Sequence, residues 1–321
     1  MNNSVHPKEV YLLEKFSSLD FFETMRNNYH NFLTGLEGLF ELYIHNLPYD
    51  LRTLPFSEQA DINWGETVLP NLRNTMDRID IAYIKIKSGD FTYLDCAAEI
   101  RSNDKGLSEF SFYWMDNLPH NKVKQCWDYY LISKKYALII EKTYPTYWDK
   151  GFLNNEFPKA EIFNGINIKL PGSYPIYRLD SRNIVRSKEK INKTGVYVCN
   201  EYDNKLIFLA SSKEDDNGFA PRYACRNKET REKLYFETSW TLIERISDQG
   251  GTVESIVIEN LKALAGQKCP KTGYWWSPAN QSNSRYFTEG DIFPKLESNW
   301  GETIWYWLCC TNLSLKAYSA I

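Results

Sequence analysis

The spacing of apolar residues changes near residue 160, and this change limits the folds that the chain can adopt. Before it, apolar side chains recur every three or four residues, as on one face of an amphipathic helix. After it, short runs rich in Val, Ile, Tyr and Trp are separated by Gly, Pro and Asn, which is typical of strands and turns. The 321 residues are enough for two domains. We therefore predict an α+β protein with a helical domain over residues 1–160 and a small β-rich domain, antiparallel and barrel- or sandwich-like, over residues 161–321.

Four helices are predicted in the first domain, over residues 19–43, 67–87, 91–101 and 121–144. Ser18 or Asp20 is placed to cap the first helix, and Asp90 is placed to cap the third. Pro145 limits the fourth helix, because proline cannot continue the helical hydrogen-bond pattern. Long amphipathic helices joined by short loops favour a helical bundle.

Strands are predicted over residues 195–199, 206–209, 239–245 and 303–308, whereas residues 253–264 fit either a strand or a helix. The first two runs indicate a hairpin, because a turn-rich connection joins them. In the last run, Trp305 and Trp307 share one face while Ile304, Tyr306 and Leu308 share the other, because side chains alternate along a strand. Both faces are apolar, so we expect this strand to be buried on both sides.

The charge of the chain is nearly balanced, with 38 basic and 41 acidic residues and a formal net charge of −3. This balance argues against a general nucleic-acid-binding protein, which carries a basic excess. The acidic excess lies in the helical half, because residues 1–150 hold 21 acidic and 16 basic side chains. We therefore expect no nucleic-acid partner.

No pattern of catalytic or metal-binding residues emerges from the sequence. His30 and His45 lie on one predicted helix about 22 Å apart at 1.5 Å per residue, so they cannot share a metal ion. The motifs HExxH, GxSxG, GxxxxGK[ST] and GxGxxG are absent. Residues 215–218 resemble part of a calcium loop but lack its final Glu. We expect neither an enzyme nor a site for a metal or cofactor.

The cysteines and the first residues of the chain indicate a reducing compartment. Seven cysteines are scattered without a CxxC pair, which favours free thiols over disulfides. The first residues lack the basic and apolar segments of a secretory signal, and no run of 18 apolar residues is long enough to cross a membrane. We expect a cytoplasmic protein with no membrane partner.

Tryptophan is concentrated late in the chain, where six of the ten tryptophans lie between Trp240 and Trp307. Three explanations are open. The aromatic side chains pack a small β core, form a stacking platform for sugars, or anchor a protein–protein interface. We favour the core, because residues 303–308 are apolar on both faces.

Three blocks in this region, CPxTGYWWSPA, RYFxxGDxFP and WGxTIWYW, follow one another between residues 269 and 307. Together with residues 194–198 and 240–251, they resemble a family of bacterial immunity proteins encoded beside polymorphic toxins, including Rhs-type effectors of type VI secretion. The resemblance covers about residues 190–310, with Asp291 and Phe293 in place of Glu and Met, and no motif of the helical half matches. The signature residues are Cys269, Pro270, Gly273, Trp275, Trp276, Pro278, Arg285, Phe287, Gly290, Pro294, Gly301, Trp305 and Trp307.

The resemblance implies a protein without enzymatic activity that binds a cognate toxin, encoded by the adjacent gene, and so protects the producing cell. An inhibitor located in the cytoplasm fits a toxin whose target is cytoplasmic, such as a nucleic acid, a nucleotide or a protein. Occlusion of the toxin's active site and allosteric inhibition are both open, as is the oligomeric state of the chain.

Acidic side chains of the helical half are the candidate contacts with a basic toxin surface, because complementary charge accelerates association. The candidates are Asp61, Glu66, Asp77, Asp80, Asp90, Asp95 and Glu99. Asp77 and Asp80 are three residues apart on one predicted helix, so they share a face. An ordinary solvated helix surface explains the same charges.

Two other classes of function stay open. A glycan-binding or adaptor module would use exposed Trp275 and Trp276 beside a groove. A hydrolase would use a carboxylate pair, or a cysteine together with a histidine such as His120, in a cleft.

Overall fold

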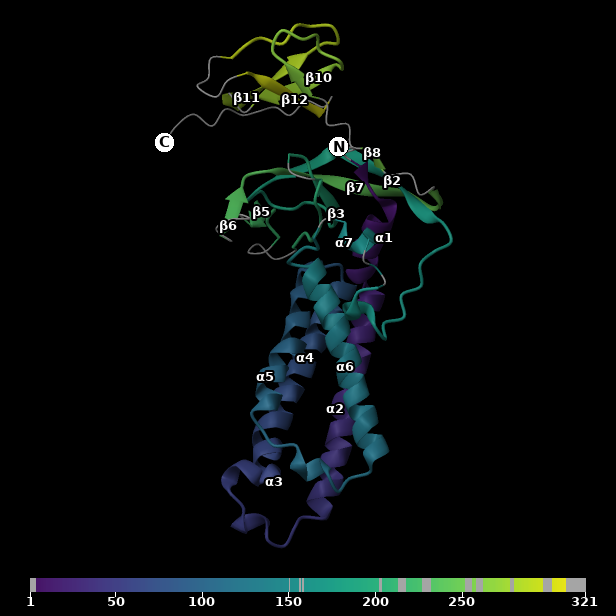
Figure 1. Cartoon of the computed structure of the whole chain (residues 1–321), viewed down its shortest axis with the longest axis vertical. Helices are drawn as coiled ribbons and strands as arrows, with labels where there is room; N and C mark the ends of the chain where they lie inside the picture. Colours follow the sequence, from purple (N-terminus) through teal and green to yellow (C-terminus); the bar gives the residue numbers. More distant parts are fainter. Residues whose placement is uncertain are drawn as a thin grey trace.

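The computed structural model describes residues 4–149, 151–155, 157, 159–201, 204–212, 218–226, 232–251, 256–257, 262–277, 280–296 and 302–309. The protein belongs to the α+β class, as predicted, with helices in the N-terminal part followed by antiparallel sheets. Figure 1 shows a long helical bundle with the sheets gathered at one of its ends. No helix in the described part of the chain is both long and apolar enough to cross a membrane.

The helices are α1 (Pro7–Phe16), α2 (Leu19–His45), α3 (Ala60–Ile62), α4 (Leu69–Lys87), α5 (Ala98–Ser108), α6 (His120–Thr143) and α7 (Phe152–Asn155). Short 3-10 turns are η1 (Leu51–Thr53), η2 (Phe56–Glu58), η4 (Phe91–Ala97), η5 (Tyr113–Met115) and η6 (Glu161–Phe163), and η3 (Asn63–Val68) is a π-helix. The predicted first, second and fourth helices correspond to α2, α4 and α6.

Capping side chains fix where several of these helices begin. Ser18 caps α2, because its hydroxyl accepts a hydrogen bond from the backbone N–H of Phe21 at 3.3 Å. Asp90 is the N-cap of η4 and accepts from the backbone N–H of Thr92 at 3.2 Å. The predicted third helix therefore starts as a 3-10 turn, and its α-helical part continues to Ser108 rather than ending near residue 101. Helix α1 was not among the predicted elements.

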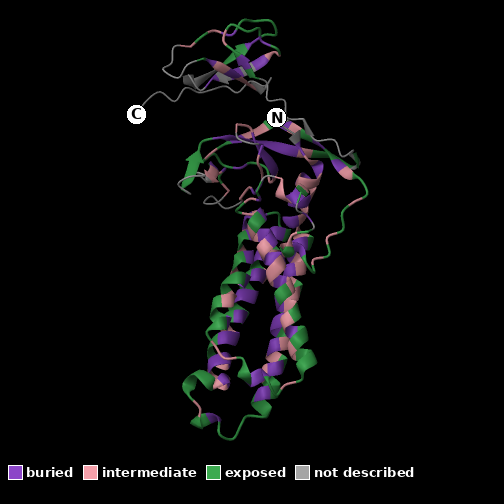
Figure 2. Cartoon of the chain, viewed as in Figure 1, coloured by how far each residue is buried: buried purple, intermediate pink, exposed green. Residues whose placement is uncertain are grey.

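The bundle is held by aromatic rings on α2 that pack against rings on α6. The ring centroids of Phe21 and Tyr136 are 4.5 Å apart, and those of Phe32 and Tyr130 are 4.6 Å apart. Buried residues form stripes along the helices while the opposite faces are exposed (Figure 2), as the three- and four-residue spacing requires. At 1.5 Å per residue, the 27 residues of α2 span about 40 Å.

The strands are β1 (Ser4–Val5), β2 (Tyr174–Arg186), β3 (Gly195–Cys199), β4 (Leu206–Leu209), β5 (Tyr223–Arg226), β6 (Lys233–Phe236), β7 (Ser239–Gly251), β8 (Ile256–Val257), β9 (Lys262–Leu264), β10 (Gly273–Ser277), β11 (Asn280–Phe287) and β12 (Ile304–Cys309). They form two four-stranded sheets, ordered β2-β7-β3-β4 and β11-β10-β12-β9, and two pairs, β1-β8 and β5-β6. The predicted hairpin is β3–β4, and the predicted strand over residues 239–245 is the first part of β7.

The first sheet is buried on both faces. Val196, Val198 and Phe208 belong to the same apolar cluster as the helices, whereas Tyr197 and Trp240 belong to a second cluster on the other face. This division follows from the alternation of side chains along β3. The large cluster therefore runs from the helices across residue 160 into the sheet.

The second sheet has an apolar cluster of its own, which consists of Ala263, Cys269, Trp275, Phe287, Phe293 and Trp305. The expectation that the last strand is buried on both faces is wrong for the side chains that the structure describes. Trp305 is buried, but Ile304 and Tyr306 on the opposite face are half-buried. The physical reason is that the cluster covers the face of β12 that carries Trp305.

Candidate protein-binding surface at the end of the bundle

The two long connections of the bundle meet at its end farthest from the sheets (Figure 1). One joins α2 to α4 and the other joins α5 to α6, and we call residues 41–68 and 106–121 the distal surface. Large apolar side chains exposed there are Leu42, Ile44, Leu47, Tyr49, Phe56, Phe112 and Tyr113. Phe56 is 65% exposed, Tyr113 is 78% exposed and Tyr49 is fully exposed. Exposed apolar side chains that gather at one end of a molecule can form an interaction site.

Trp64 holds the two connections together beneath this surface. It is buried, and its indole Nε1 donates a hydrogen bond to the backbone oxygen of Ser111 at 3.0 Å. Its ring lies 5.4 Å from that of Phe112 and 5.2 Å from that of Trp114, edge to face in both pairs. Trp64 therefore links the first connection to Ser111 and to exposed Phe112 of the second.

The distal surface is strongly acidic, with seven carboxylates and Arg52 as its one Lys or Arg. Six of the carboxylates are exposed: Glu41, Asp50, Glu58, Glu66, Glu109 and Asp116. Arg52 is engaged by the seventh, because its Nη1 and Nη2 donate to Oδ1 and Oδ2 of Asp61 at 3.0 and 2.5 Å. This pair lowers the pKa of Asp61. The other six carboxylates of the distal surface therefore have no Lys or Arg of this surface to pair with.

A cavity of about 260 Å³ opens in the distal surface. Its apolar wall includes Tyr43, Leu51, Leu54, Ala60, Trp64, Trp114 and Leu118, and its polar lining includes Asn46, Ser57, Glu58, Ser111 and Asn117. The indole Nε1 of Trp114 is buried and has no hydrogen-bond partner among the described residues. An apolar wall with a few polar groups is the usual construction of a binding pocket.

The acidic residues singled out from the sequence have different surroundings. Asp61 and Glu66 lie in the distal surface, whereas Asp77 is exposed on α4. Asp80 accepts from Arg26 Nε at 2.5 Å, and Glu99 accepts from Arg78 at 2.9 Å.

Asp90 and Asp95 lie at the start of η4 and within it, near the opposite end of α4. Asp90 is buried and serves as a helix cap, so it is not a surface charge. Burial raises the pKa of the Asp95 carboxyl. The seven candidates therefore do not form one patch.

Two tryptophans of the signature, Trp275 and Trp305, pack inside the second sheet. Trp275 and Trp305 are buried, and their Nε1 atoms donate to the backbone oxygens of Lys271 at 3.1 Å and Pro294 at 3.0 Å. The other signature residues differ in burial. The buried ones are Cys269, Gly273 and Phe287, the half-buried ones are Pro294 and Trp307, and the exposed ones are Pro270, Arg285 and Gly290. Outside the described residues lie Pro278, Gly301 and the Trp276 side chain.

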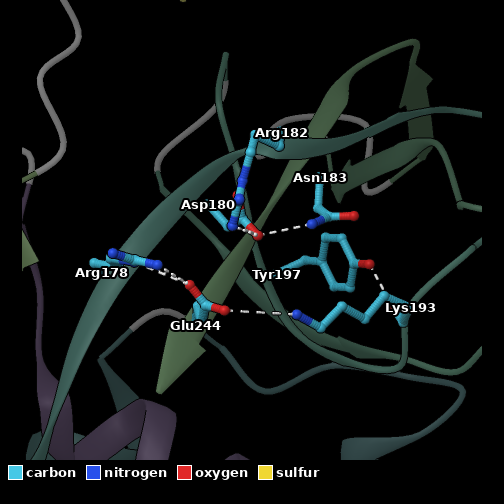
Figure 3. A network of polar contacts seen from close by, with 7 residues as sticks. All are labelled: Arg178, Asp180, Arg182, Asn183, Lys193, Tyr197 and Glu244. Carbon is cyan, nitrogen blue, oxygen red and sulfur yellow. Dashed lines mark hydrogen bonds and ion pairs between the residues drawn. The ribbon is translucent and has the colours of Figure 1, made fainter. Parts of the chain in front are cut away.

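A polar network on the first sheet is structural (Figure 3). Asp180 accepts hydrogen bonds from the backbone N–H of Arg182 at 3.1 Å and from Asn183 Nδ2 at 2.7 Å, which fixes the irregular pairing between Asp180 and Ile184. The hydrogen bond from the Arg182 side chain lowers the pKa of Asp180 to about 2. Beside it, Glu244 accepts from Arg178 at 2.6 Å.

One histidine and two cysteines illustrate the surroundings of groups that other proteins use in catalysis. His6 caps α1 by accepting from the backbone N–H of Lys8 at 3.2 Å. Burial raises the pKa of the Cys96 and Cys126 thiols to about 12, so neither is a ready nucleophile. Across the described ranges, no three His, Cys, Asp or Glu side chains gather to hold a metal ion.

Comparison of the chain with protein-family models, with curated proteins and with solved structures finds no match. The distal surface was missed in the sequence analysis, although residues 47–56 place Tyr49 and Phe56 in a loop with two prolines. Aromatic residues in a loop of that composition were the available signal.

Proposed function

We propose that the chain is an immunity protein that binds a cognate secreted antibacterial toxin and holds it through the distal surface. One observation carries this proposal: seven exposed large apolar side chains lie among six exposed carboxylates at one end of the bundle. The resemblance of residues 190–310 to immunity proteins of polymorphic toxins supports the class of partner. In this proposal the protein acts in the cytoplasm and is not an enzyme.

The chemistry of the distal surface favours a basic protein as the partner. Tyr49, Phe56 and Tyr113 supply large rings of the kind that dominate the energy of protein interfaces. The surrounding carboxylates accelerate encounter with a positive surface and disfavour acidic proteins. Proteins that act on nucleic acids carry such positive surfaces. A toxin that acts on nucleic acid is therefore the partner that fits this surface best.

The distance between the distal surface and the sheets matters for how inhibition works. The bundle places the surface about one length of α2, roughly 40 Å, from the first sheet. A toxin domain held there meets loops and helix ends rather than strands. We therefore propose that these loops cover the basic surface with which the toxin would bind its target.

The proposal is tested by co-expression with the toxin encoded beside the gene, with growth and co-purification as readouts. We expect the chain to restore growth and to purify with the toxin. The variant carrying both Phe56→Ala and Tyr113→Ala should lose both effects. Ile84→Ala is the matched control, because Ile84 is 65% exposed, like Phe56, but lies near the other end of α4.

Each outcome has a defined meaning. Rescue and a complex that depend on Phe56 and Tyr113, but not on Ile84, support binding through the distal surface. Rescue without a complex contradicts neutralisation by binding, because the damage would then be repaired or prevented in another way. Absence of both rescue and binding contradicts the immunity function itself.

A further inference from the structure

We infer that the cavity of the distal surface is a pocket for one Lys or Arg side chain of the partner protein. This inference rests on the proposed function, since it names the group by which the toxin would be anchored. It is carried by the aromatic wall of the cavity, by the carboxylate of Glu58 at its edge and by the pairing of Arg52 with Asp61.

The wall of the cavity suits the aliphatic stem and the charged head of a long basic side chain. Tyr43, Trp64 and Trp114 form a continuous aromatic group, with centroids 5.4 Å apart for Tyr43–Trp114 and 5.2 Å for Trp64–Trp114. Lys and Arg side chains pack their methylene groups on apolar surfaces of this kind. The faces of aromatic rings also attract a cation that lies within about 6 Å of the ring centroid.

Glu58 supplies the charge that selects a cation. Its carboxylate is exposed, it lines the cavity, and no described Lys or Arg forms an ion pair with it. The nearest basic residue in sequence, Arg52, is already bound to Asp61 and to Gln59 Oε1 at 3.0 Å. A basic side chain from outside therefore finds an unpaired carboxylate, which is the complementary charge that an interface requires.

The other polar groups fit a peptide better than an isolated ion. Asn46 and Asn117 line the cavity and carry both donors and acceptors of hydrogen bonds. The Nε1 of Trp114 lacks an acceptor within the described residues, and buried donors of this kind are normally satisfied. A segment of backbone that carries the basic side chain has N–H and carbonyl groups that can pair with the two amides. An apolar side chain alone would leave Glu58 desolvated and unpaired, which is unfavourable.

The test needs no toxin. The probes are Nα-acetyl-arginine amide and Nα-acetyl-citrulline amide, which have almost the same shape but differ in charge. They are titrated into the full chain, labelled with nitrogen-15, and the indole N–H resonance of Trp114 is followed after assignment with Trp114→Phe. We expect a saturable shift with the arginine amide, and an affinity at least fivefold higher than for the citrulline amide.

Two matched variants distinguish binding in the cavity from a general effect of negative charge on the distal surface. Glu58→Gln should reduce the ratio of the affinity for the arginine amide to that for the citrulline amide to nearly one. Glu66→Gln should leave this ratio unchanged. Glu66 has the same charge and exposure on the same surface but does not line the cavity. Equal affinity for the two probes, no saturable shift, or equal effects of the two variants would each overturn the inference.

This experiment and the co-expression experiment fail independently. If the toxin binds through Phe56 and Tyr113 while the probes do not bind, the inference about the cavity is wrong and the proposed function stands. If the probes bind as expected and the toxin does not, the pocket stands as a site for basic side chains and the toxin is not its partner.

Discussion

Tyr177 and Glu14 join the first sheet to the helices, although 163 residues separate them in the sequence. The hydroxyl of Tyr177 on β2 donates a hydrogen bond to Oε2 of Glu14 on α1 at 2.8 Å. Arg245 of β7 lies 3.8 Å from the same oxygen. Burial raises the pKa of Glu14 and also that of Tyr177. This contact therefore places a titratable carboxyl between the two halves of the molecule.

The raised pKa of Glu14 makes this contact sensitive to pH. Because the folded-state pKa lies above the unfolded value, ionisation of the carboxyl disfavours the folded state as the pH rises through these values. Glu14→Gln removes this effect, so the free energy of unfolding of the variant relative to wild type should increase between pH 4 and pH 7. Urea unfolding at several pH values, followed by circular dichroism, measures it. A constant or decreasing difference would contradict the expectation.

Asp180 should show the opposite dependence on pH. Its pKa is lowered to about 2, so the stability that it contributes is present above the ordinary value of 3.8 and is lost as the pH falls through that value toward 2. Asp180→Asn should lower the free energy of unfolding at pH 7 by about 1–3 kcal/mol, because the amide offers one acceptor oxygen in place of two and removes the charge that pairs with Arg182. The deficit should shrink below pH 3.5. Asp248→Asn is the control on the neighbouring strand, since the Asp248 side chain is 85% exposed.

The separate apolar cluster of the second sheet leads to a third prediction. Trp275→Ala should lower the free energy of unfolding of that sheet by about 3–5 kcal/mol, which is typical of truncating a buried tryptophan. Hydrogen exchange measured by mass spectrometry should show lost protection over residues 262–309 and unchanged protection in α2 and α6. Trp240→Ala is the comparison, because Trp240 packs on the first sheet. Equal loss of protection in α2 after Trp275→Ala would mean that the two parts unfold together.

Charge on the distal surface should control the rate at which the toxin associates. Glu66→Lys and Asp116→Lys should each lower the association rate constant at low salt with little change in dissociation, because exposed charges mainly steer encounter. The difference from wild type should diminish at 0.5 M salt, where charges are screened over a few ångströms. Surface plasmon resonance at two salt concentrations measures both rates. Asp248→Lys, far from the distal surface in the fold, should leave the association rate unchanged.

Local patterns in the sequence predicted much of the fold. The helical spacing located α2, α4 and α6, Ser18 was one of the two predicted caps of α2, and the turn-rich connection identified the β3–β4 hairpin. These features depend on neighbouring residues, which a sequence shows directly. The start of α1 was missed because its cap is His6, which is not among the usual capping residues.

The candidate site could not be predicted in the same way, because it depends on which distant segments meet. Asp80 pairs with Arg26, 54 residues away, so its charge is partly neutralised. The distal surface forms only when the loop after α2 lies beside the loop after α5, where Trp64 and Ser111 are hydrogen-bonded. Neither pairing can be recognised from residues that are neighbours in the sequence.

The exposed apolar side chains of the distal surface lie on loops and helix ends and contribute little to the interior. Exposed substitutions of this kind usually change the free energy of unfolding by less than about 0.5 kcal/mol. Tyr49, Phe56 and Tyr113 are therefore free to change while Trp64 and the bundle beneath them stay the same. If the distal surface binds the toxin as proposed, a lineage that carries this fold can exchange that surface one residue at a time as its partner diverges, without first rebuilding the scaffold.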